Sequence, residues 1–188
     1  MVDETSKRKS PIEKSGAVLY KTSVFSPNEY SIIRKELAGC TKHLQEEDAS
    51  SIAQKRLGMT LNPESAVVQV LQEGNLRDLV QKSVGYECEL STNLPIELRI
   101  YEREGAGMTW HVDDVLYDPP QVEVVWTLEN DSDCVTMWKD LVADEVRSIE
   151  TEPNSAILLL AGGAPHCVTS LRHGKRVILK CAFVRKGS

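Results

Sequence analysis

The pattern of apolar and polar positions changes near residue 95 and divides the chain into two regions. In the first region the clearest element is a helix. Ser26 can cap this helix, Pro27 suits its first turn, and Glu29 completes a capping box three residues after the cap. The apolar positions that follow recur at helical spacing, and they are Ile32, Ile33 and Leu37. Gly39 then marks the expected end of the helix.

Three further elements are expected in the first region. Residues 17–25 are β-like, and residues 54–61 form a second short strand before an Asn-Pro pair. Residues 76–84 have apolar positions at helical spacing, which predicts a second helix, and Asn75 is the candidate cap.

From residue 95 onward, short β-rich runs are separated by turn residues, with no helical pattern between them. The expected strands are 97–101, 108–111, 122–128, 134–138, 145–149, 156–160, 167–171 and 176–184. This spacing predicts a two-sheet antiparallel barrel, or jelly roll, over about residues 95–185. The helices of the first region would cover one sheet from outside. The expected fold class is therefore α+β, mainly β, with N-terminal supporting helices.

Residues 1–15 are polar and lack periodicity, so we expect a flexible arm, followed by a single domain over residues 16–188. The formal net charge of -6 does not fit the basic surface that nucleic-acid binding usually needs. No run is long and apolar enough to cross a bilayer, so no membrane partner is expected.

The five cysteines are scattered, odd in number and without a C-x-x-C pair. This pattern argues against a disulfide framework or a thiolate zinc site and favours a reducing compartment. Cytoplasm is the expected location, while the cluster Lys7-Arg8-Lys9 leaves a nuclear location open.

The candidate chemistry begins with a His-x-Asp pair at the end of an expected strand. His111 and Asp113 are two residues apart, so both side chains point to the same face of an extended strand. A third ligand must come from another strand, and His166 is well placed after a Gly-Gly-Ala-Pro turn. Two imidazoles and one carboxylate leave open positions on a metal, as in non-haem Fe(II) oxygenases.

Two more side chains suit a bound co-substrate in such a barrel. Arg176, ten residues after His166, opens an apolar strand and would point a guanidinium fork inward for capture of a carboxylate. Tyr101, ten residues before His111, could bring a hydroxyl to the same co-substrate. Lys175 is the alternative anchor, because a shift of one residue in register exchanges the side chain that faces inward.

The second region resembles the 2-oxoglutarate/Fe(II)-dependent dioxygenase superfamily, most closely its prolyl-4-hydroxylase-like branch. The resemblance spans about residues 97–184 and rests on Tyr101-x-x-x-Gly105, Trp110-His111-Val112-Asp113, Val125-Trp126-Thr127-Leu128, the run 153–159, His166-Cys167-Val168 and the run 174–179. It implies a double-stranded β-helix, iron ligation by His111, Asp113 and His166, pairing of Arg176 with the distal carboxylate of 2-oxoglutarate, and a hydrogen bond from Tyr101 to the same molecule.

The implied activity is hydroxylation of a protein side chain, of the prolyl type, or of a small molecule. Fe(II), 2-oxoglutarate and O2 are the implied cofactors, and ascorbate is a further candidate. The branch often has a Gly-Gly-x-Thr turn where this chain has residues 133–138, so the surface that faces the substrate differs. The substrate, whether peptide or small molecule, and the oligomeric state stay open.

Three other functions are alternatives to a hydroxylase. An AlkB-like oxidative demethylase of nucleic acid shares the chemistry, but the acidic charge and the lack of a basic, aromatic stripe count against it. A non-catalytic metal-binding barrel would be expected to lack part of the site. A zinc hydrolase could use the same His-Asp-His ligands, yet it gives no reason for Arg176.

Overall fold

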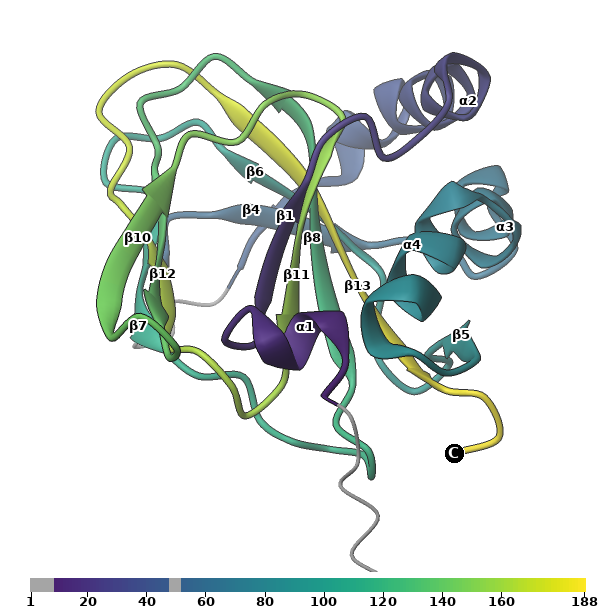
Figure 1. Ribbon diagram of the computed structural model, residues 1–188. Helices are drawn as coiled ribbons and strands as arrows, with labels where there is room; N and C mark the ends of the chain where they lie inside the picture. Colours follow the sequence, from purple (N-terminus) through teal and green to yellow (C-terminus); the bar gives the residue numbers. More distant parts are fainter. Residues whose placement is uncertain (1–8, 48–51) are drawn as a thin grey trace, which may run out of the picture.

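The computed structural model describes residues 9–47 and 52–188, arranged in three layers (Figure 1). A five-stranded antiparallel sheet faces an eight-stranded antiparallel sheet, and helices cover the outer face of the larger one. The mainly β fold with two antiparallel sheets, expected from the sequence, is confirmed. Within the described residues, no helix is both long and apolar enough to cross a membrane.

The large sheet is built mostly from strands of the second half of the chain. Its order is β1 (Val18–Lys21), β11 (Ser155–Leu160), β8 (Val122–Asn130), β13 (Arg176–Arg185), β6 (Glu97–Tyr101), β4 (Leu57–Thr60) and β2 (Gln45–Glu46), with β5 (Cys88–Leu90) paired to one end of β13. The long strands β8 and β13 pair along most of their length at the centre of this sheet.

The small sheet has the order β10 (Glu145–Ile149), β9 (Thr136–Asp140), β12 (His166–Val168), β7 (Gly107–His111) and β3 (Ala53–Gln54). Its strand β12 is short and lies between β9 and β7. Strand β10 forms one edge, and its residues are mostly exposed.

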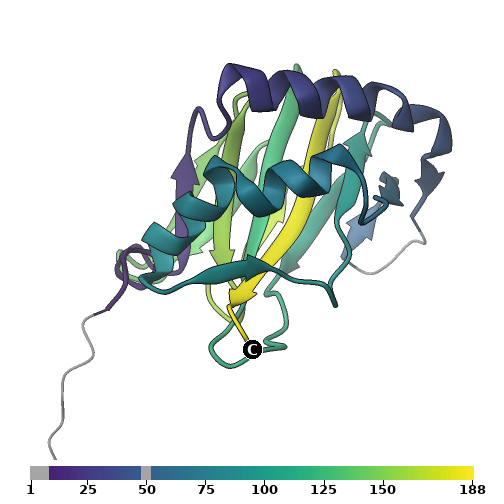
Figure 2. The same cartoon turned by 90° about the vertical axis from the view of Figure 1, so that its right-hand side faces the viewer.

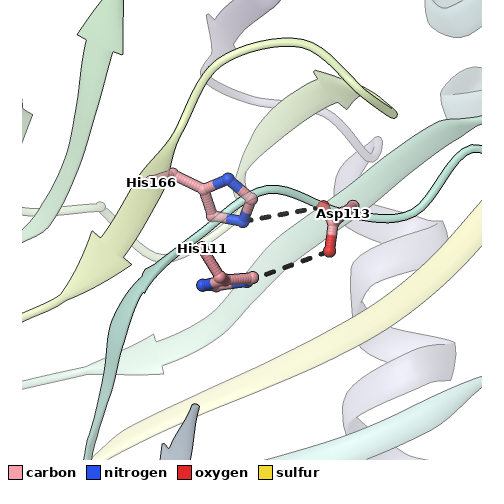
Figure 3. A group of neighbouring side chains, drawn as sticks. All are labelled: His111, Asp113 and His166. Atoms are coloured by element: carbon pink, nitrogen blue, oxygen red, sulfur yellow. Dashed lines mark ion pairs between the residues drawn. The ribbon is translucent and has the colours of Figure 1, made fainter.

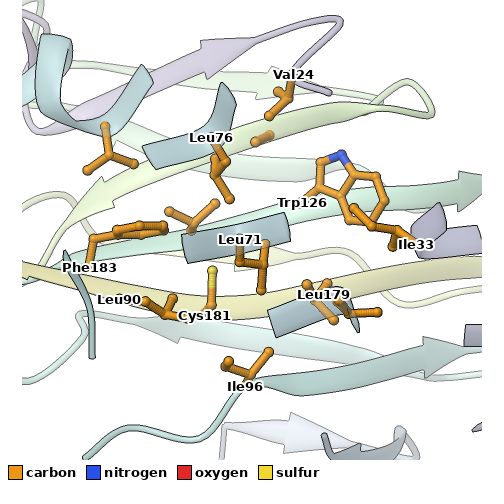
Figure 4. Packing of buried hydrophobic residues seen from close by; sticks show 14 of the residues in the cluster. Val24, Ile33, Leu71, Leu76, Leu90, Ile96, Trp126, Leu179, Cys181 and Phe183 are labelled. Atoms are coloured by element: carbon orange, nitrogen blue, oxygen red, sulfur yellow. The ribbon is translucent and has the colours of Figure 1, made fainter. Parts of the chain in front are cut away.

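The helices are α1 (Pro11–Lys14), α2 (Pro27–Ala38), η1 (Cys40–His43), α3 (Ala66–Glu73) and α4 (Asn75–Val84). Figure 2 shows α2 and the α3–α4 pair running across the face of the large sheet. The apolar residues of these helices pack on the outward side chains of β8 and β13 (Figure 4). Trp126 and Leu179 are fully buried in this core, and Phe25 and Tyr30 contact Trp126 edge-on.

Alternation along the strands gives the large sheet two different faces. On β13, Val177, Leu179 and Cys181 face the helices, so Arg176, Ile178 and Lys180 face the small sheet. On β6, Leu98 and Ile100 join the helix-side core, whereas Arg99 and Tyr101 point to the opposite side. Charged and polar side chains therefore gather between the two sheets.

All eight strands expected after residue 95 are present, and the expected bounds of β6 and β10 are the same as in the structure. The helix at Pro27 is also confirmed, with the full capping box between Ser26 and Glu29. All five cysteines are free thiols, and four of them are buried.

Three expectations about the helices differ from the structure, and the expected strands 17–25 and 54–61 are shorter there, as β1 and β4. Residues 11–14, expected within the flexible arm, form α1, because Ser10 and Glu13 make a capping box and Ile12 is buried in the core. Residues 1–8 lie outside the described residues. Helix α3 was not expected, although Ser65 caps it, and α4 is capped by Gly74 with Asn75 as its first residue.

The cap of α2 gives a first prediction. Ser26→Ala removes the acceptor for the Glu29 N–H, at 3.3 Å, and should lower the free energy of unfolding by about 1 kcal/mol. Urea denaturation followed by circular dichroism measures the change. Ser31→Ala, at an exposed position inside the same helix, is the control and should be neutral or slightly stabilising. An equal loss in both variants would contradict the capping role.

Candidate metal centre and co-substrate pocket

The three candidate ligands come together at one end of the small sheet. His111 ends β7, His166 opens β12, and the two residues are direct partners across the antiparallel pair. Asp113 follows two residues after His111, and the ligand atoms of all three side chains lie within 4.8 Å of one another. Figure 3 shows both imidazoles turned toward the Asp113 carboxylate.

The turn before His166 is hydrogen-bonded to the segment that carries Asp113. Gly162 has a φ of +71°, and its N–H donates to the carbonyl of Asp113 at 2.9 Å. A Cβ at Gly162 would meet the Val115 side chain, and a residue other than glycine would be strained at this positive φ. The glycine lets the two ligand-bearing segments pack closely.

Both imidazoles have a defined orientation. His111 Nδ1 lies 2.9 Å from the Thr109 carbonyl and His166 Nδ1 lies 3.1 Å from the Ala164 carbonyl. A carbonyl can only accept, so each Nδ1 carries the proton and each Nε2 offers a lone pair. The two Nε2 atoms lie 3.9 and 3.6 Å from the Asp113 oxygens. Two nitrogen donors and one carboxylate fit a divalent metal such as Fe(II), with open positions left over.

Burial also keeps His166 in the neutral form that a metal needs. Loss of hydration lowers the pKa of His166 below its ordinary value of 6.5, and attraction to Asp113 only partly offsets this effect.

The lowered pKa of His166 predicts how the stability of the metal-free protein depends on pH. Because the folded-state pKa of His166 lies below the unfolded-state value, the unfolded chain takes up the proton first. Stability is therefore fully present above about pH 6.5 and falls as the pH drops toward the folded-state pKa. Urea unfolding in the presence of a chelator, between pH 7.5 and pH 5 (about the range of histidine titration), should show this loss. The variant His166→Gln should lose less stability over this pH range than the wild type. An equal loss in the variant and the wild type would contradict the assignment of this pH dependence to His166.

The His-Asp-His cluster borders a small cavity between the two sheets, with a volume of about 40 Å³. Its lining includes His111, Asp113, His166, Tyr101 and Arg176. A larger cavity, of about 620 Å³, opens between α3, α4, β5 and the C-terminal residues. None of the described residues that line the larger cavity belongs to the His-Asp-His cluster, so the candidate site lies in the smaller one.

Arg176 is the most unusual side chain of the small cavity. It is 1% exposed, and its Nε and Nη1 have no hydrogen-bond partner among the described residues. Burial lowers the pKa of its guanidinium, which nevertheless stays charged at neutral pH. Thr136 Oγ1, in the same cavity, also lacks a described partner. A buried cation with unused donors fits an anionic ligand such as the carboxylate of 2-oxoglutarate.

Tyr101 lies beside Arg176 and is fully buried. Its phenol oxygen accepts a hydrogen bond from Arg56 Nη1 at 3.3 Å. Because a guanidinium can only donate, the phenol proton is left to donate elsewhere. The guanidinium carbons of Arg56 and Arg176 lie 5.8 and 5.9 Å from the centre of the Tyr101 ring. Two cations therefore lie close to the ring, and one of them, Arg176, lines the cavity.

Sequence reasoning missed Arg56 and the carboxylate that holds it. Arg56 is 4% exposed, its Nε donates to Glu47 at 2.6 Å, and Glu47 also accepts from Arg99 at 3.1 Å. No local pattern marks these residues, since the pairing of β2 with β4 brings Glu47 to Arg56, and the pairing of β4 with β6 brings Arg56 to Tyr101. The residue proposed as an alternative anchor, Lys175, is not among the residues that line the cavity, whereas Arg176 is.

Solved structures provide the comparison for this arrangement. A prolyl-4-hydroxylase from Pseudomonas putida is similar with a TM-score of 0.72 and 15% identity, covering 94% of this chain and 96% of that one. A prolyl hydroxylase from Trichoplax adhaerens, in complex with a hypoxia-inducible factor peptide, has a TM-score of 0.74 at 10% identity, covering 93% and 86%. The chain has the fold of the 2-oxoglutarate/Fe(II) oxygenases. This finding confirms, at the level of the fold, the resemblance found in the sequence.

A third structure of this oxygenase fold adds information on ligands. HygX from Streptomyces hygroscopicus, with nickel, 2-oxoglutarate and hygromycin B bound, has a TM-score of 0.66 at 14% identity, covering 94% of this chain and 86% of that one. No protein-family model matches the sequence, and no curated protein matches it significantly.

Proposed function

We propose that the chain is an Fe(II)- and 2-oxoglutarate-dependent dioxygenase that hydroxylates a protein side chain, of the prolyl type, or a small molecule. One observation carries the proposal: the His-Asp-His cluster shares a single cavity with the Arg176 guanidinium, two of whose nitrogens have no partner among the described residues. A metal site alone would need no buried cation beside it. The two facing sheets would then form the double-stranded β-helix expected from the sequence.

In this proposal each polar residue of the cavity has a definite task. His111 and His166 hold Fe(II) through Nε2, and Asp113 holds it through its carboxylate. Arg176 pairs with the distal carboxylate of 2-oxoglutarate, and Tyr101 donates its phenol proton to the same group. The apolar lining, including Ile157 and Leu159, keeps water from the site. With O2, the bound iron and 2-oxoglutarate supply the oxidising power for hydroxylation, coupled to decarboxylation of 2-oxoglutarate to succinate and carbon dioxide.

Exposed apolar side chains bear on the choice of substrate. Val115 and Leu116, which follow Asp113, and Leu141 and Val142, in the turn between β9 and β10, are all exposed. Such side chains suit contact with an apolar part of a substrate. Among the structures of similar fold, one is complexed with a peptide and another with hygromycin B, so both classes belong in a screen, prolyl peptides first.

The test is succinate formation from 2-oxoglutarate by anaerobically purified protein that is loaded with Fe(II) and then exposed to air, with and without ascorbate. We expect slow turnover without a substrate and faster turnover with the correct one. Absence of turnover, together with failure of 2-oxoglutarate to bind the metal-loaded protein, would contradict the proposal and favour a binding or hydrolytic barrel. Turnover stimulated only by methylated oligonucleotides would favour the demethylase.

A further inference from the structure

A second cation lines the same cavity, four residues beyond Arg176. Lys180 lies on the inward face of β13, as do Arg176 and Ile178, and all three line the cavity. Four residues of extended strand span about 13 Å, so the two long side chains start well apart. Lys180 is at the metal end, because its Nζ lies 3.9 Å from Asp113 Oδ1.

The ammonium of Lys180 has charged neighbours but no close hydrogen bond among the described residues. Besides Asp113, its nearest carboxylate is Glu123, whose Oε2 lies at 3.5 Å. Both distances exceed the 2.7–3.2 Å (roughly) of an N–H···O hydrogen bond. Arg99, another cation of the cavity, differs, since it lies 2.7 Å from Glu97 and 3.1 Å from Glu47. Arg99 therefore makes close ion pairs within the protein, whereas the two ion pairs of Lys180 are longer.

Glu123 does not fully satisfy Lys180. Its side chain is 7% exposed, and its Oε1 already accepts from Gln121 Nε2 at 3.2 Å. Gln121 in turn donates to the Asp114 carbonyl at 2.8 Å and accepts from the Leu116 N–H at 3.1 Å. Glu123 is therefore held toward the loop that follows Asp113, and Lys180 contacts only its second oxygen.

A bound metal would change the surroundings of Lys180. A divalent ion at His111, Asp113 and His166 takes the lone pairs of Asp113 and places two positive charges near the ammonium. A divalent metal and an ammonium that are both close to the Asp113 carboxylate would repel each other strongly in a partly buried site. An anion between the ammonium and the metal would turn that repulsion into attraction.

We propose that Lys180 is a second carboxylate anchor of the pocket and pairs with the carboxylate of 2-oxoglutarate that lies nearest the metal ligands. This inference rests on the proposed function, which brings such a carboxylate to that place. Arg176 and Lys180 then hold the two ends of one dicarboxylate from a single strand. Their spacing selects ligands with acid groups at both ends.

Three acids of related shape separate the two anchors. 2-Oxoglutarate has both carboxylates, 2-oxopentanoate keeps only the one beside the keto group, and 4-oxopentanoate keeps only the distal one. Their dissociation constants are measured by titration calorimetry with Mn(II)-loaded protein, which accepts the same nitrogen and oxygen ligands without redox chemistry. Mn(II) affinity is measured separately for each variant.

We expect Lys180→Met to weaken 2-oxoglutarate and 2-oxopentanoate by roughly tenfold to a hundredfold and to leave 4-oxopentanoate unchanged. Arg176→Met should weaken 2-oxoglutarate and 4-oxopentanoate and leave 2-oxopentanoate unchanged. Lys180→Arg, which restores the charge, should recover most of the affinity. Lys175→Met is the matched control, since this neighbouring lysine does not line the cavity, and it should bind all three acids like the wild type.

The outcomes separate this inference from the function on which it rests. If wild-type protein binds Mn(II) but none of the acids, the proposed function itself fails. If Arg176→Met weakens 2-oxoglutarate while Lys180→Met does not, only the role of Lys180 is overturned. Loss of Mn(II) affinity in Lys180→Met, with acid binding otherwise normal at saturating metal, would also overturn it, because Lys180 would then serve Asp113 alone.

Discussion

Replacing His166 with alanine is expected to abolish 2-oxoglutarate-dependent succinate formation and metal binding while the fold persists. The side chain supplies one of three metal donors, and its Nδ1 contacts only the local Ala164 carbonyl. Loss of a residue that merely orients a ligand costs about 10–100-fold in metal affinity or activity, so loss of a ligand should cost at least about a hundredfold. Mn(II) titration and succinate release measure the two effects.

The matched control is His43→Ala, which removes an exposed histidine far from the cluster in the sequence. It should leave both metal affinity and turnover unchanged. His111→Ala and Asp113→Ala should behave like His166→Ala. Full activity in any of these three variants, with a circular dichroism spectrum like that of the wild type, would contradict the assignment of iron ligands.

Arg176→Met is expected to change stability and binding in opposite directions. In the ligand-free protein the guanidinium is buried with two nitrogens that lack described partners. Burying a charged group without partners destabilises the folded state, and the uncharged methionine removes this effect. The free energy of unfolding should therefore stay equal or rise by about 1–3 kcal/mol. Affinity for 2-oxoglutarate should fall by about a hundredfold or more, since two charge-assisted hydrogen bonds are lost.

Urea denaturation without ligand and calorimetry with 2-oxoglutarate measure the two changes on the same samples. Arg34→Met is the control, because its exposed ion pair with Glu129, at 3.5 Å, should contribute little to either quantity. A strongly destabilised Arg176→Met protein would show that the guanidinium serves the fold, and the carboxylate role would then lose its main support.

The parts of the fold that the sequence predicts are those that local rules determine. Ser26 and Glu29 form their capping box within one helical turn, and the period-two runs of β6 and β10 need no knowledge of their partners. The signals of α3 were also local, since Ser65 can cap it and Val67, Val68 and Leu71 are buried along one side of the helix. That helix was missed, although its signals were present.

The features of the fold and the site that the sequence does not predict depend on contacts between distant segments. The two-residue strands β2 and β3 exist only because β4 and β7 lie beside them. Arg56 reaches Tyr101 across 45 positions of sequence. Lys180 is different, because it has the same strand parity as Arg176 and could have been found from alternation alone. What alternation could not show is that Asp113 and Glu123 would lie on either side of its ammonium.

The direct pairing of His111 with His166 also bears on the stability of the small sheet. Beyond this pair, β7 and β12 share one further register pair, Met108 with Val168, after an irregularity in the ladder. A metal bound to both histidines would therefore act as a clip across a short and interrupted part of the small sheet. By mass action it should suppress local opening there, which amide hydrogen exchange would detect as protection confined to β7, β12 and β9. The supply of metal would then set the lifetime of the folded small sheet against proteases as well as the proposed activity.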